Sequence, residues 1–422
     1  MITPRRDARR TPTSRRRSAA VAVGATAAVA LVLAVGGTGT GTAEASPVAG
    51  PHRPVGSVLP VANGAWAYDN GTTGAWASAI SSYNAAATPG HALTQVFSYA
   101  TDMEMYCPGD LAANCTAADL ESYYTPTSSG WALTLAYYDA FNSVRKTVSI
   151  SPIIDGRTDA GGYLTELNQL SPALAATFAD QVAAQVCADP RIDGIQFDIE
   201  PFDVTSKNGQ YYFYLQIAKD FAGQHAAATA TAAATAATTA DPYGCVSAAH
   251  PQGRYFSVFT FASSIQPGTA EAANVAAFTS AYHNAYVIDS LYDLGTRPAG
   301  SLNDLPVYQR LVTQQVEEMK SWADREHIPY GFGVPASASV HEYETCTGTC
   351  APGADGSTGN PMIDYTRDAV TAIDRSGASR DGLFHGTDIW AFTDKVSSEG
   401  AAVTPALASA NVLQYLEHSL PG

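Results

Sequence analysis

Eight short runs rich in β-forming residues alternate with eight longer helical stretches along most of this chain. The predicted strands are Gly64–Tyr68, Thr94–Tyr99, Thr147–Ile154, Gly194–Glu200, Tyr255–Phe261, Tyr286–Leu291, Tyr330–Val334 and Gly386–Phe392. The predicted helices are Ala75–Ala86, Trp131–Ser143, Tyr163–Cys187, Gly209–Ala222, Ala270–Tyr282, Pro306–His327, Pro361–Ser376 and Pro405–Ser419. Strands that alternate with helices form parallel sheets, and eight such units close into a barrel. The sequence therefore predicts the α/β class and a single (β/α)8 TIM barrel with loop insertions over residues 61–422.

The fourth predicted strand carries two acids on one face. From Ile195 to Glu200 apolar and polar residues alternate, so Gln196, Asp198 and Glu200 share a face and stand about 6.5–7 Å apart. Buried carboxylates are unfavourable unless they are paired, and a structural explanation is pairing with Arg, Lys or backbone donors. The functional explanation is acid catalysis, because one ionised acid raises the pKa of its neighbour. The position at the carboxyl end of the strand favours catalysis, since parallel barrels carry their active sites there.

The N-terminal segment predicts export. Seven arginines precede an uncharged Ala/Val/Leu run over Ala19–Val35, and an A-x-A cleavage pattern follows at residues 43–45. We therefore predict an export signal peptide over residues 1–45 and a secreted (extracellular) protein. The arginines at residues 15–17 fit the twin-arginine route. A membrane anchor is the alternative, but the run is short for a span and a cleavage pattern follows it.

The predicted mature chain is strongly acidic. Removal of residues 1–45 takes away seven arginines and two acids, which changes the formal net charge from −16 to −21. Such a surface repels nucleic acid and anionic lipid, so we expect no nucleic-acid partner and no membrane association after signal cleavage. A neutral or cationic polymer fits better, and we expect a monomer. Residues 46–60, rich in Pro, Gly and Val, are predicted to be a linker.

Six cysteines lie in the exported part of the chain. An even number of cysteines in an oxidising compartment predicts disulfides. Proximity in sequence favours Cys107–Cys115 and Cys346–Cys350, which leaves Cys187 with Cys245. Fifteen connectivities are formally possible, so the pairing remains open at this stage.

Motifs for several other chemistries are missing from the sequence. It contains no G-x-S-x-G, no H-E-x-x-H, no P-loop and no G-x-G-x-x-G after a strand. The nine histidines are scattered without the spacing of metal ligands. We therefore expect neither a metal nor a cofactor.

Two loops and one biased tract interrupt the repeat. Residues 101–130 follow the second predicted strand and Ser339–Asn360 follow the seventh, which places both at the predicted catalytic rim. Loops at this rim usually shape substrate access. The Ala/Thr tract Ala226–Ala240 is predicted to be a helix extension or an exposed loop without chemistry.

Asp193-Gly194-x-Gln196-x-Asp198-x-Glu200 resembles the D-G-x-D-x-D-x-E signature of family 18 glycoside hydrolases, the chitinase-like (β/α)8 barrels. The match covers one short motif and departs from it at Gln196, where the family most often has Asp and some peptidoglycan-directed relatives have an amide. The resemblance implies a glycosidase of the chitinase or endo-β-N-acetylglucosaminidase type. Its substrate would be a polysaccharide or glycan with β-linked N-acetylhexosamine: chitin, peptidoglycan or the core of an N-glycan.

The family's substrate-assisted mechanism assigns roles to the two acids. By resemblance, Glu200 protonates the glycosidic oxygen and the N-acetyl carbonyl of the substrate attacks the anomeric carbon. Asp198 then orients and stabilises the charged intermediate, and Glu200 acts as base for water, with net retention. Gln196 is expected to contact substrate and to leave Asp198 ionised to lower pH than an Asp would.

Further site residues follow from the same resemblance. Tyr292-Asp293 ends the sixth predicted strand and is similar to the family's Tyr-Asp pair, in which Tyr holds the acetamido group and Asp positions it. Trp390 of the eighth strand is similar to the family's Trp beneath the reacting sugar. Tyr68 and Tyr99, on the first two strands, are expected to line the same pocket. A structural role in the core is the alternative for each of them.

One family feature is missing, and two other functions stay open. The third strand often ends in Ser-x-Gly-Gly, whereas Ser149–Gly156 reads differently and leaves Asp155 as an acid without an assigned role. The first alternative is a non-catalytic carbohydrate-binding protein on the same barrel. The second is a two-carboxylate glycosidase for another sugar, with Glu200 as acid and Asp293 or Asp155 as its partner.

Overall fold

The structure is a computed structural model, and it describes the barrel strands, most of the helices and parts of the loops. The described residues are 62–67, 75–102, 105, 107–119, 149–158, 164–224, 241–262, 266, 268–292, 294, 305–336, 362–393, 396–398, 401–403 and 410–422. The predicted signal peptide and linker lie outside these ranges. The same holds for the helix predicted at Trp131–Ser143, the Ala/Thr tract and the loop Ser339–Asn360.

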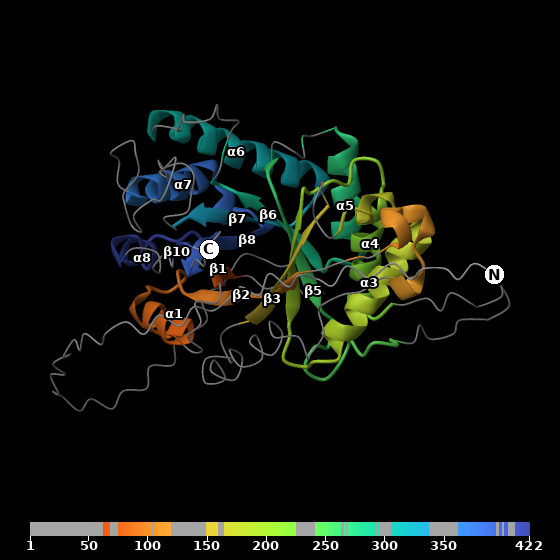
Figure 1. Cartoon of the computed structure of the whole chain (residues 1–422). Helices are drawn as coiled ribbons and strands as arrows, with labels where there is room; N and C mark the ends of the chain where they lie inside the picture. Colours follow the sequence, from red (N-terminus) through yellow and green to blue (C-terminus); the bar gives the residue numbers. More distant parts are fainter. Residues whose placement is uncertain are drawn as a thin grey trace, which may run out of the picture.

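Eight parallel strands close into a barrel in the order of the sequence (Figure 1). They are β1 (Asn63–Ala67), β2 (Leu93–Asp102), β3 (Ser149–Arg157), β4 (Gly194–Glu200), β5 (Tyr255–Thr260), β6 (Ala285–Ser290), β7 (Tyr330–Pro335) and β8 (Phe384–Thr393). Each strand pairs with its neighbours in sequence, and β1 closes the barrel against β8. The α/β class, the (β/α)8 topology and all eight predicted strands are therefore confirmed, β4 with the same bounds. A separate pair, β9 (Val396–Ser398) and β10 (Ala401–Val403), follows β8.

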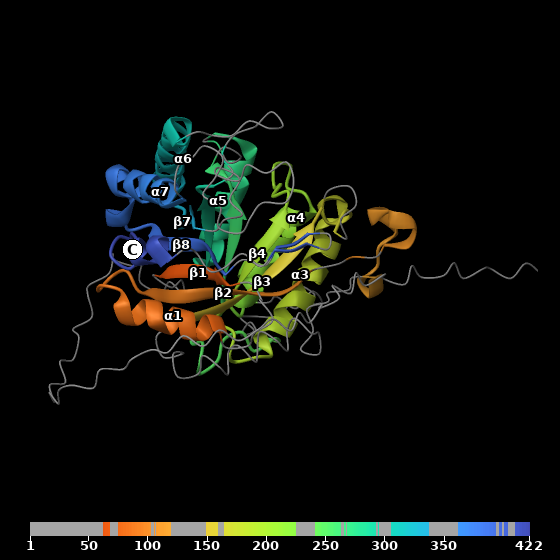
Figure 2. The same cartoon turned by 60° about the vertical axis from the view of Figure 1, so that its left-hand side comes forward.

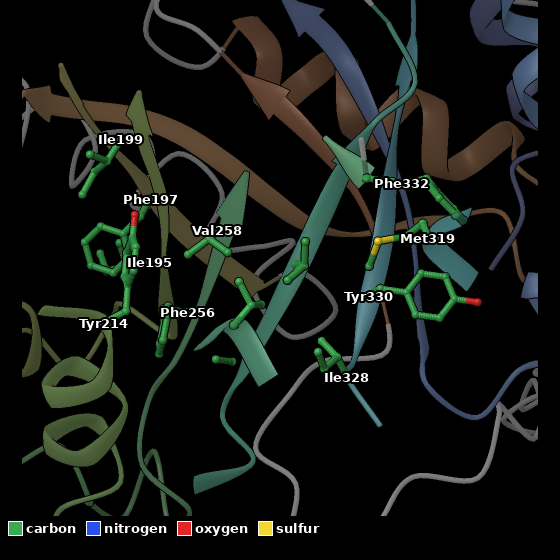
Figure 3. Close-up of a cluster of buried hydrophobic side chains, with 14 of the residues drawn as sticks. Ile195, Phe197, Ile199, Tyr214, Phe256, Val258, Met319, Ile328, Tyr330 and Phe332 are labelled. Carbon is green, nitrogen blue, oxygen red and sulfur yellow. The ribbon is translucent and has the colours of Figure 1, made fainter. Parts of the chain in front are cut away.

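The apolar face of β4 packs outward against α4 (Gly209–Phe221). Ile195, Phe197 and Ile199 are buried, and Figure 3 shows them along the strand beside Tyr214 of α4. The ring of Phe197 lies 5.4 Å from that of Phe213 and 5.8 Å from that of Tyr214. Burial of such side chains contributes about 1.5–3 kcal/mol each, so this contact fixes which face of β4 points away from the barrel interior.

Helices surround the strands. Besides α4 they are α1 (Ala75–Ala86), α3 (Pro172–Cys187), α5 (Ala270–Tyr282), α6 (Leu305–Glu326), α7 (Met362–Ser376) and α8 (Ala410–Leu416). Figures 1 and 2 show α3 and α4 beside β3 and β4, and α6 and α7 on the side of β7. The predictions for α1 and α5 are confirmed with the same bounds, and those for α4, α6 and α7 to within one residue. None of the described helices is long and apolar enough to cross a membrane.

Two helix predictions were too long. The helix expected from Tyr163 begins at Pro172, because Ser171 caps it by accepting a hydrogen bond from the backbone N–H of Leu174. Proline favours the first helical turn, where its missing N–H costs nothing. The last helix ends at Leu416 and not at Ser419.

Two of the predicted disulfides are present in the structure. Cys107 is bonded to Cys115 and Cys187 to Cys245, each pair with 4.7 Å between Cα atoms. The proposed partners Cys346 and Cys350 lie outside the described residues. The first bridge closes a loop after β2 whose short 3₁₀ turns are η1 (Pro108–Asp110), η2 (Ala112–Asn114) and η3 (Ala117–Asp119). This loop contacts α3, where Gln181 donates to the Ala117 carbonyl at 3.2 Å.

A hydrogen-bonded polar layer fills the amino-terminal part of the barrel interior. Gln95 Nε2 donates to Ser151 Oγ at 3.3 Å and to Tyr255 Oη at 3.2 Å, while Tyr286 Oη donates to Gln95 Oε1 at 3.2 Å. The Tyr255 hydroxyl also bonds Ser149, at 2.9 Å, and Ser151. The serines of β3 therefore serve packing at the closed end of the barrel, where buried polar groups need partners.

An acid pair joins α3 and α4, and one of its members is buried. Asp220 is fully buried, and Gln216 Nε2 donates to its Oδ1 at 2.8 Å and to Asp180 Oδ1 at 3.0 Å. Burial, helped by a hydrogen bond to Asp180, raises the pKa of Asp220 to about 8. The ordinary value in an unfolded chain is about 3.9. Between these two pH values the unfolded state loses a proton that the folded state keeps, so the free energy of unfolding falls as pH rises from about 4 to about 8.

We expect Asp220→Asn to remove this pH dependence, because the amide stays neutral. The variant should gain Tm relative to wild type as pH rises from 5 to 8, measured by scanning calorimetry. A constant difference for Asp220→Asn would contradict the assignment.

Candidate active site

The polar residues of β4 lie on the face that lines the barrel, opposite the Phe197 face. Gln196 is fully buried and bonds Trp66 of β1 across the interior. Asp198 is half-buried and Glu200 is exposed. Because side chains alternate along a strand, these three share the interior face. Exposure therefore increases toward the carboxyl end, where Glu200 is open to solvent and to a substrate.

Gln196 is held by two hydrogen bonds. Trp66 Nε1 donates to Gln196 Oε1 at 3.2 Å, and Gln196 Nε2 donates to the Phe197 carbonyl at 2.9 Å. Trp66 is itself 1% exposed, so both partners of the cross-barrel bond are buried. The predicted site residue Gln196 is thus part of a rigid pair between β4 and β1.

An aromatic stack lies next to Trp66. The rings of Tyr292 and Trp390 are 4.5 Å apart and 22° from parallel, and the Phe259 ring stacks on Tyr292 at 6.0 Å. Phe259 meets Trp66 edge-on at 6.2 Å. A Cβ placed on Gly333 of β7 would lie 3.3 Å from both Trp66 and Tyr292, so the missing side chain lets these two rings approach over it.

The structure therefore connects three of the predicted site residues. Gln196 bonds Trp66, Trp66 lies beside Tyr292, and Tyr292 stacks on Trp390. Tyr292 is 4% exposed, whereas Trp390 is half-buried and has part of its surface open. Aromatic surface of this kind is what the apolar face of a sugar ring packs against.

The main chain around Glu200 is fixed from two sides. The backbone N–H of Thr158, after β3, donates to the Glu200 carbonyl at 2.8 Å. Gln210 of α4 is fully buried; it donates to the Pro201 carbonyl at 3.4 Å and accepts from the Asp203 N–H at 3.0 Å. The Glu200–Pro201 peptide bond is cis. The end of β4 is thus anchored to its neighbours on both sides.

The first two residues of the motif have a structural role at the other end of β4. Asp193 precedes the strand and pairs with His250, whose Nε2 lies 3.0 Å from Asp193 Oδ1. A Cβ on Gly194 would come within 2.5–2.6 Å of Tyr255, so only glycine fits there. The motif therefore divides into a structural half, Asp193-Gly194, and a polar half that reaches the open end.

Other candidate residues are placed only in part. Tyr68 and Asp293 lie outside the described residues. Tyr99 lies in β2, where only its backbone is described and pairs with Ile153. The backbone of Asp155 in β3 pairs with that of Asp198, which puts this unassigned acid at the same level of the barrel.

Burial raises the pKa of two groups near the site. Burial raises the pKa of Tyr214 well above its usual range, and the negative charge of Asp198 adds to the shift. On β8, burial also raises the pKa of Asp388 well above its ordinary value, while the Gly64 N–H works in the opposite direction. A Cβ on Gly64 would overlap the Asp388 carboxyl group, so the Asp388 side chain fits at this position only because residue 64 is glycine. Asp388 is thus favoured as a neutral acid, unlike an exposed carboxylate.

Trp66 and Gly333 are site residues that the sequence analysis missed. Trp66 precedes the predicted pocket residue Tyr68 by two positions, so the strand period already placed it on the same face. Nothing in the sequence pointed to Gly333, because its importance depends on two rings from other strands. Within the described part of the chain, no group of three or more His, Cys, Asp or Glu could hold a metal ion.

No family pattern matches the chain, and no curated protein matches its sequence. Three solved structures illustrate its structural neighbours. An endo-β-1,4-glucanase from Xanthomonas axonopodis pv. citri has 10% identity and a TM-score of 0.43, covering 81% of this chain and 89% of its own. A family 5 glycoside hydrolase, a mannosidase from Rhizomucor miehei, has 11% identity and a TM-score of 0.46. The match covers 88% of this chain and 97% of the mannosidase. A class V chitinase from Pseudomonas fluorescens Pf-5 has 11% identity and a TM-score of 0.46. The match covers 84% of this chain and 98% of the chitinase. These values are too low to transfer an activity.

Proposed function

We propose that this chain is a secreted glycoside hydrolase that cleaves β-linked N-acetylhexosamine glycans by a retaining, substrate-assisted mechanism. The observation that carries the proposal is the interior face of β4, where exposure increases from Gln196 through Asp198 to Glu200. An exposed carboxyl group at the open end of a barrel, with a second acid behind it, suits proton transfer to a bound glycan. Two disulfides agree with export to an oxidising compartment.

The aromatic stack supports a sugar as the substrate. Trp390 is half-buried, and its ring is held in place by Tyr292 on one side. In the proposed mechanism the sugar packs on Trp390, and the Tyr292 hydroxyl donates a hydrogen bond to the acetamido group. Phe259 and Trp390 enclose the Tyr292 ring, which keeps its hydroxyl in one direction and lowers the entropy cost of binding.

The two acids have different tasks in the reaction. Glu200 protonates the glycosidic oxygen as the N-acetyl carbonyl oxygen attacks the anomeric carbon and the glycosidic bond breaks. Asp198 stabilises the positive charge of the cyclic intermediate. Glu200, now ionised, removes a proton from water as the water opens the intermediate, which restores Glu200 and retains the anomeric configuration.

A panel of substrates tests the proposal. Purified mature protein is incubated with chitin oligosaccharides, peptidoglycan, an N-glycan core, and glucan and mannan oligomers that lack N-acetyl groups. We expect products only from the N-acetylated glycans, with the β-anomer formed first by NMR. Cleavage of the other oligomers alone would overturn the substrate assignment. Binding without any cleavage would instead indicate a carbohydrate-binding protein.

A two-carboxylate glycosidase is the second candidate, and one observation favours it. The register pairs Asp155 with Asp198 at the same level of the barrel, so a third acid lies on the adjoining strand. Under this alternative Asp155→Asn would abolish cleavage of glycans without N-acetyl groups. Under the substrate-assisted mechanism the same variant keeps Glu200, Asp198 and retention.

Gln196→Asp tests the role of the amide. An Asp at this position can share a proton with Asp198, whereas the amide cannot. We therefore expect the acid limb of the kcat/KM profile to move to higher pH in the variant, because Asp198 then has a like-charged neighbour. Gln314→Glu on the exposed side of α6, which also replaces an amide by an acid, is the control and should leave this limb in place. An unchanged limb in Gln196→Asp would contradict the arrangement.

A further inference from the structure

The amide of Gln196 has a single orientation that satisfies its neighbours. Its Oε1 accepts from the Trp66 indole N–H, and its Nε2 donates to the Phe197 carbonyl. A half-turn of the amide would bring Nε2 against the indole N–H and Oε1 against the carbonyl. Two donors would then face each other, as would two acceptors, in a site where Gln196 is 0% exposed. The reversed orientation is therefore excluded by the partners.

Trp66 can impose this orientation because its own ring is confined. Phe97 lies 5.0 Å from it, Phe259 meets it edge-on at 6.2 Å, and a Cβ on Gly333 would lie 3.3 Å from its far edge. A ring packed on several sides has one available direction for its only polar group. The indole N–H is thus a fixed donor aimed at Gln196.

We propose that Trp66 is a positioning residue of the active site, and this inference rests on the proposed function. By fixing the carbonyl oxygen of Gln196, Trp66 makes the amide nitrogen a permanent hydrogen-bond donor on the interior face of β4. One hydrogen of Nε2 is used by Phe197, and the second is available to an oxygen on that face. Asp198 is the next side chain on the face. In this proposal its carboxylate is the acceptor that the donor serves during the reaction. The donor carries no titrating proton and works at every pH.

A double-mutant cycle tests whether Trp66 acts through Gln196. Trp66→Phe keeps an aromatic ring but removes the N–H, and Gln196→Leu keeps the size of the side chain but removes the amide. We expect Trp66→Phe to lower kcat about tenfold with little change in KM. In the Gln196→Leu background the same change should alter kcat less than about twofold, because the bond is already gone. Effects that multiply independently in the double variant would overturn the proposal.

Trp322→Phe is the matched control for lost packing. Trp322 of α6 is 1% exposed like Trp66, but its indole N–H has no hydrogen-bond partner among the described residues. It should lose stability, measured as Tm, and keep kcat within about twofold of wild type. A kcat loss in Trp322→Phe equal to that in Trp66→Phe would mean that packing alone explains the effect, which would also overturn the proposal.

An indole NMR signal tests the bond without turnover. The chain has five tryptophans, and the indole N–H signal lost in Trp66→Phe belongs to Trp66. This signal should move upfield in Gln196→Leu and stay in place in Gln315→Leu on α6. If the signal does not move in Gln196→Leu, the hydrogen bond between Trp66 and Gln196 is absent, regardless of the activity measured. If the signal moves but wild type cleaves no glycan in the panel, the hydrogen bond is supported, and the proposed function and the positioning role of Trp66 both fail.

Discussion

Replacement of Glu200 by Gln is expected to lower kcat by a factor of about 10² or more while the fold stays intact. Gln has nearly the same shape, but its amide can neither give a proton to the glycosidic oxygen nor take one from water. Glu200 is the exposed end of the polar face of β4, and its backbone is held by Thr158. The substitution therefore removes chemistry without removing a packing contact of the core.

Initial rates on the best substrate of the panel, with Tm by calorimetry, measure this effect. Glu317→Gln on the exposed surface of α6 makes the same chemical change away from the barrel mouth and should keep both values. A substrate with a good leaving group, which needs little protonation, should recover part of the lost rate in Glu200→Gln. Activity of Glu200→Gln within about threefold of wild type would remove Glu200 from the mechanism.

Asp198→Asn is expected to have the second largest effect, a loss in kcat of about 10². Its carboxylate lies one step behind Glu200 on the same face, and in the proposed mechanism it stabilises the positive charge that develops on the acetamido group. An amide of the same size offers a dipole in place of a full charge. The loss should fall on kcat more than on KM, because the charge develops only as the bond breaks.

Asp193→Asn is the matched control, since the same substitution is made in the same motif at the opposite end of β4. Asp193 pairs with His250 at 3.0 Å, so the variant should lower Tm and keep kcat within about threefold of wild type. If Asp193→Asn lost as much activity as Asp198→Asn, the division of the motif into structural and chemical halves would be wrong.

Local pattern was enough for the barrel and for the face of β4. A period of two over Ile195–Glu200 placed three polar residues on one side, and the outward packing of Phe197 on Phe213 agrees with it. Helix starts were harder to predict. The helix ending at Cys187 was extended back to Tyr163, although Ser171-Pro172 carries the signal for a cap and a first turn.

Sequence proximity also predicted the Cys107–Cys115 disulfide, because a short loop closes at low entropy cost. Cys187 and Cys245 lie 58 residues apart and were predicted only as the pair that remained. Sequence proximity could not distinguish Asp193 from Asp198 within one motif. Their roles differ because one meets His250 at the closed end and the other lines the interior, and that difference is made by residues far along the chain.

The sequence by itself determined the number of barrel strands, the polar face of β4 and the two carboxylates toward its carboxyl end. Those features depend on the alternation of apolar and polar residues over a short segment, and this alternation can be read without knowing the rest of the fold. Only the tertiary structure decided that Trp66 holds Gln196, 130 residues away, and that Gly333 leaves room for the rings of Trp66 and Tyr292. Such contacts depend on how the strands are staggered when the barrel closes, and no local pattern encodes that stagger.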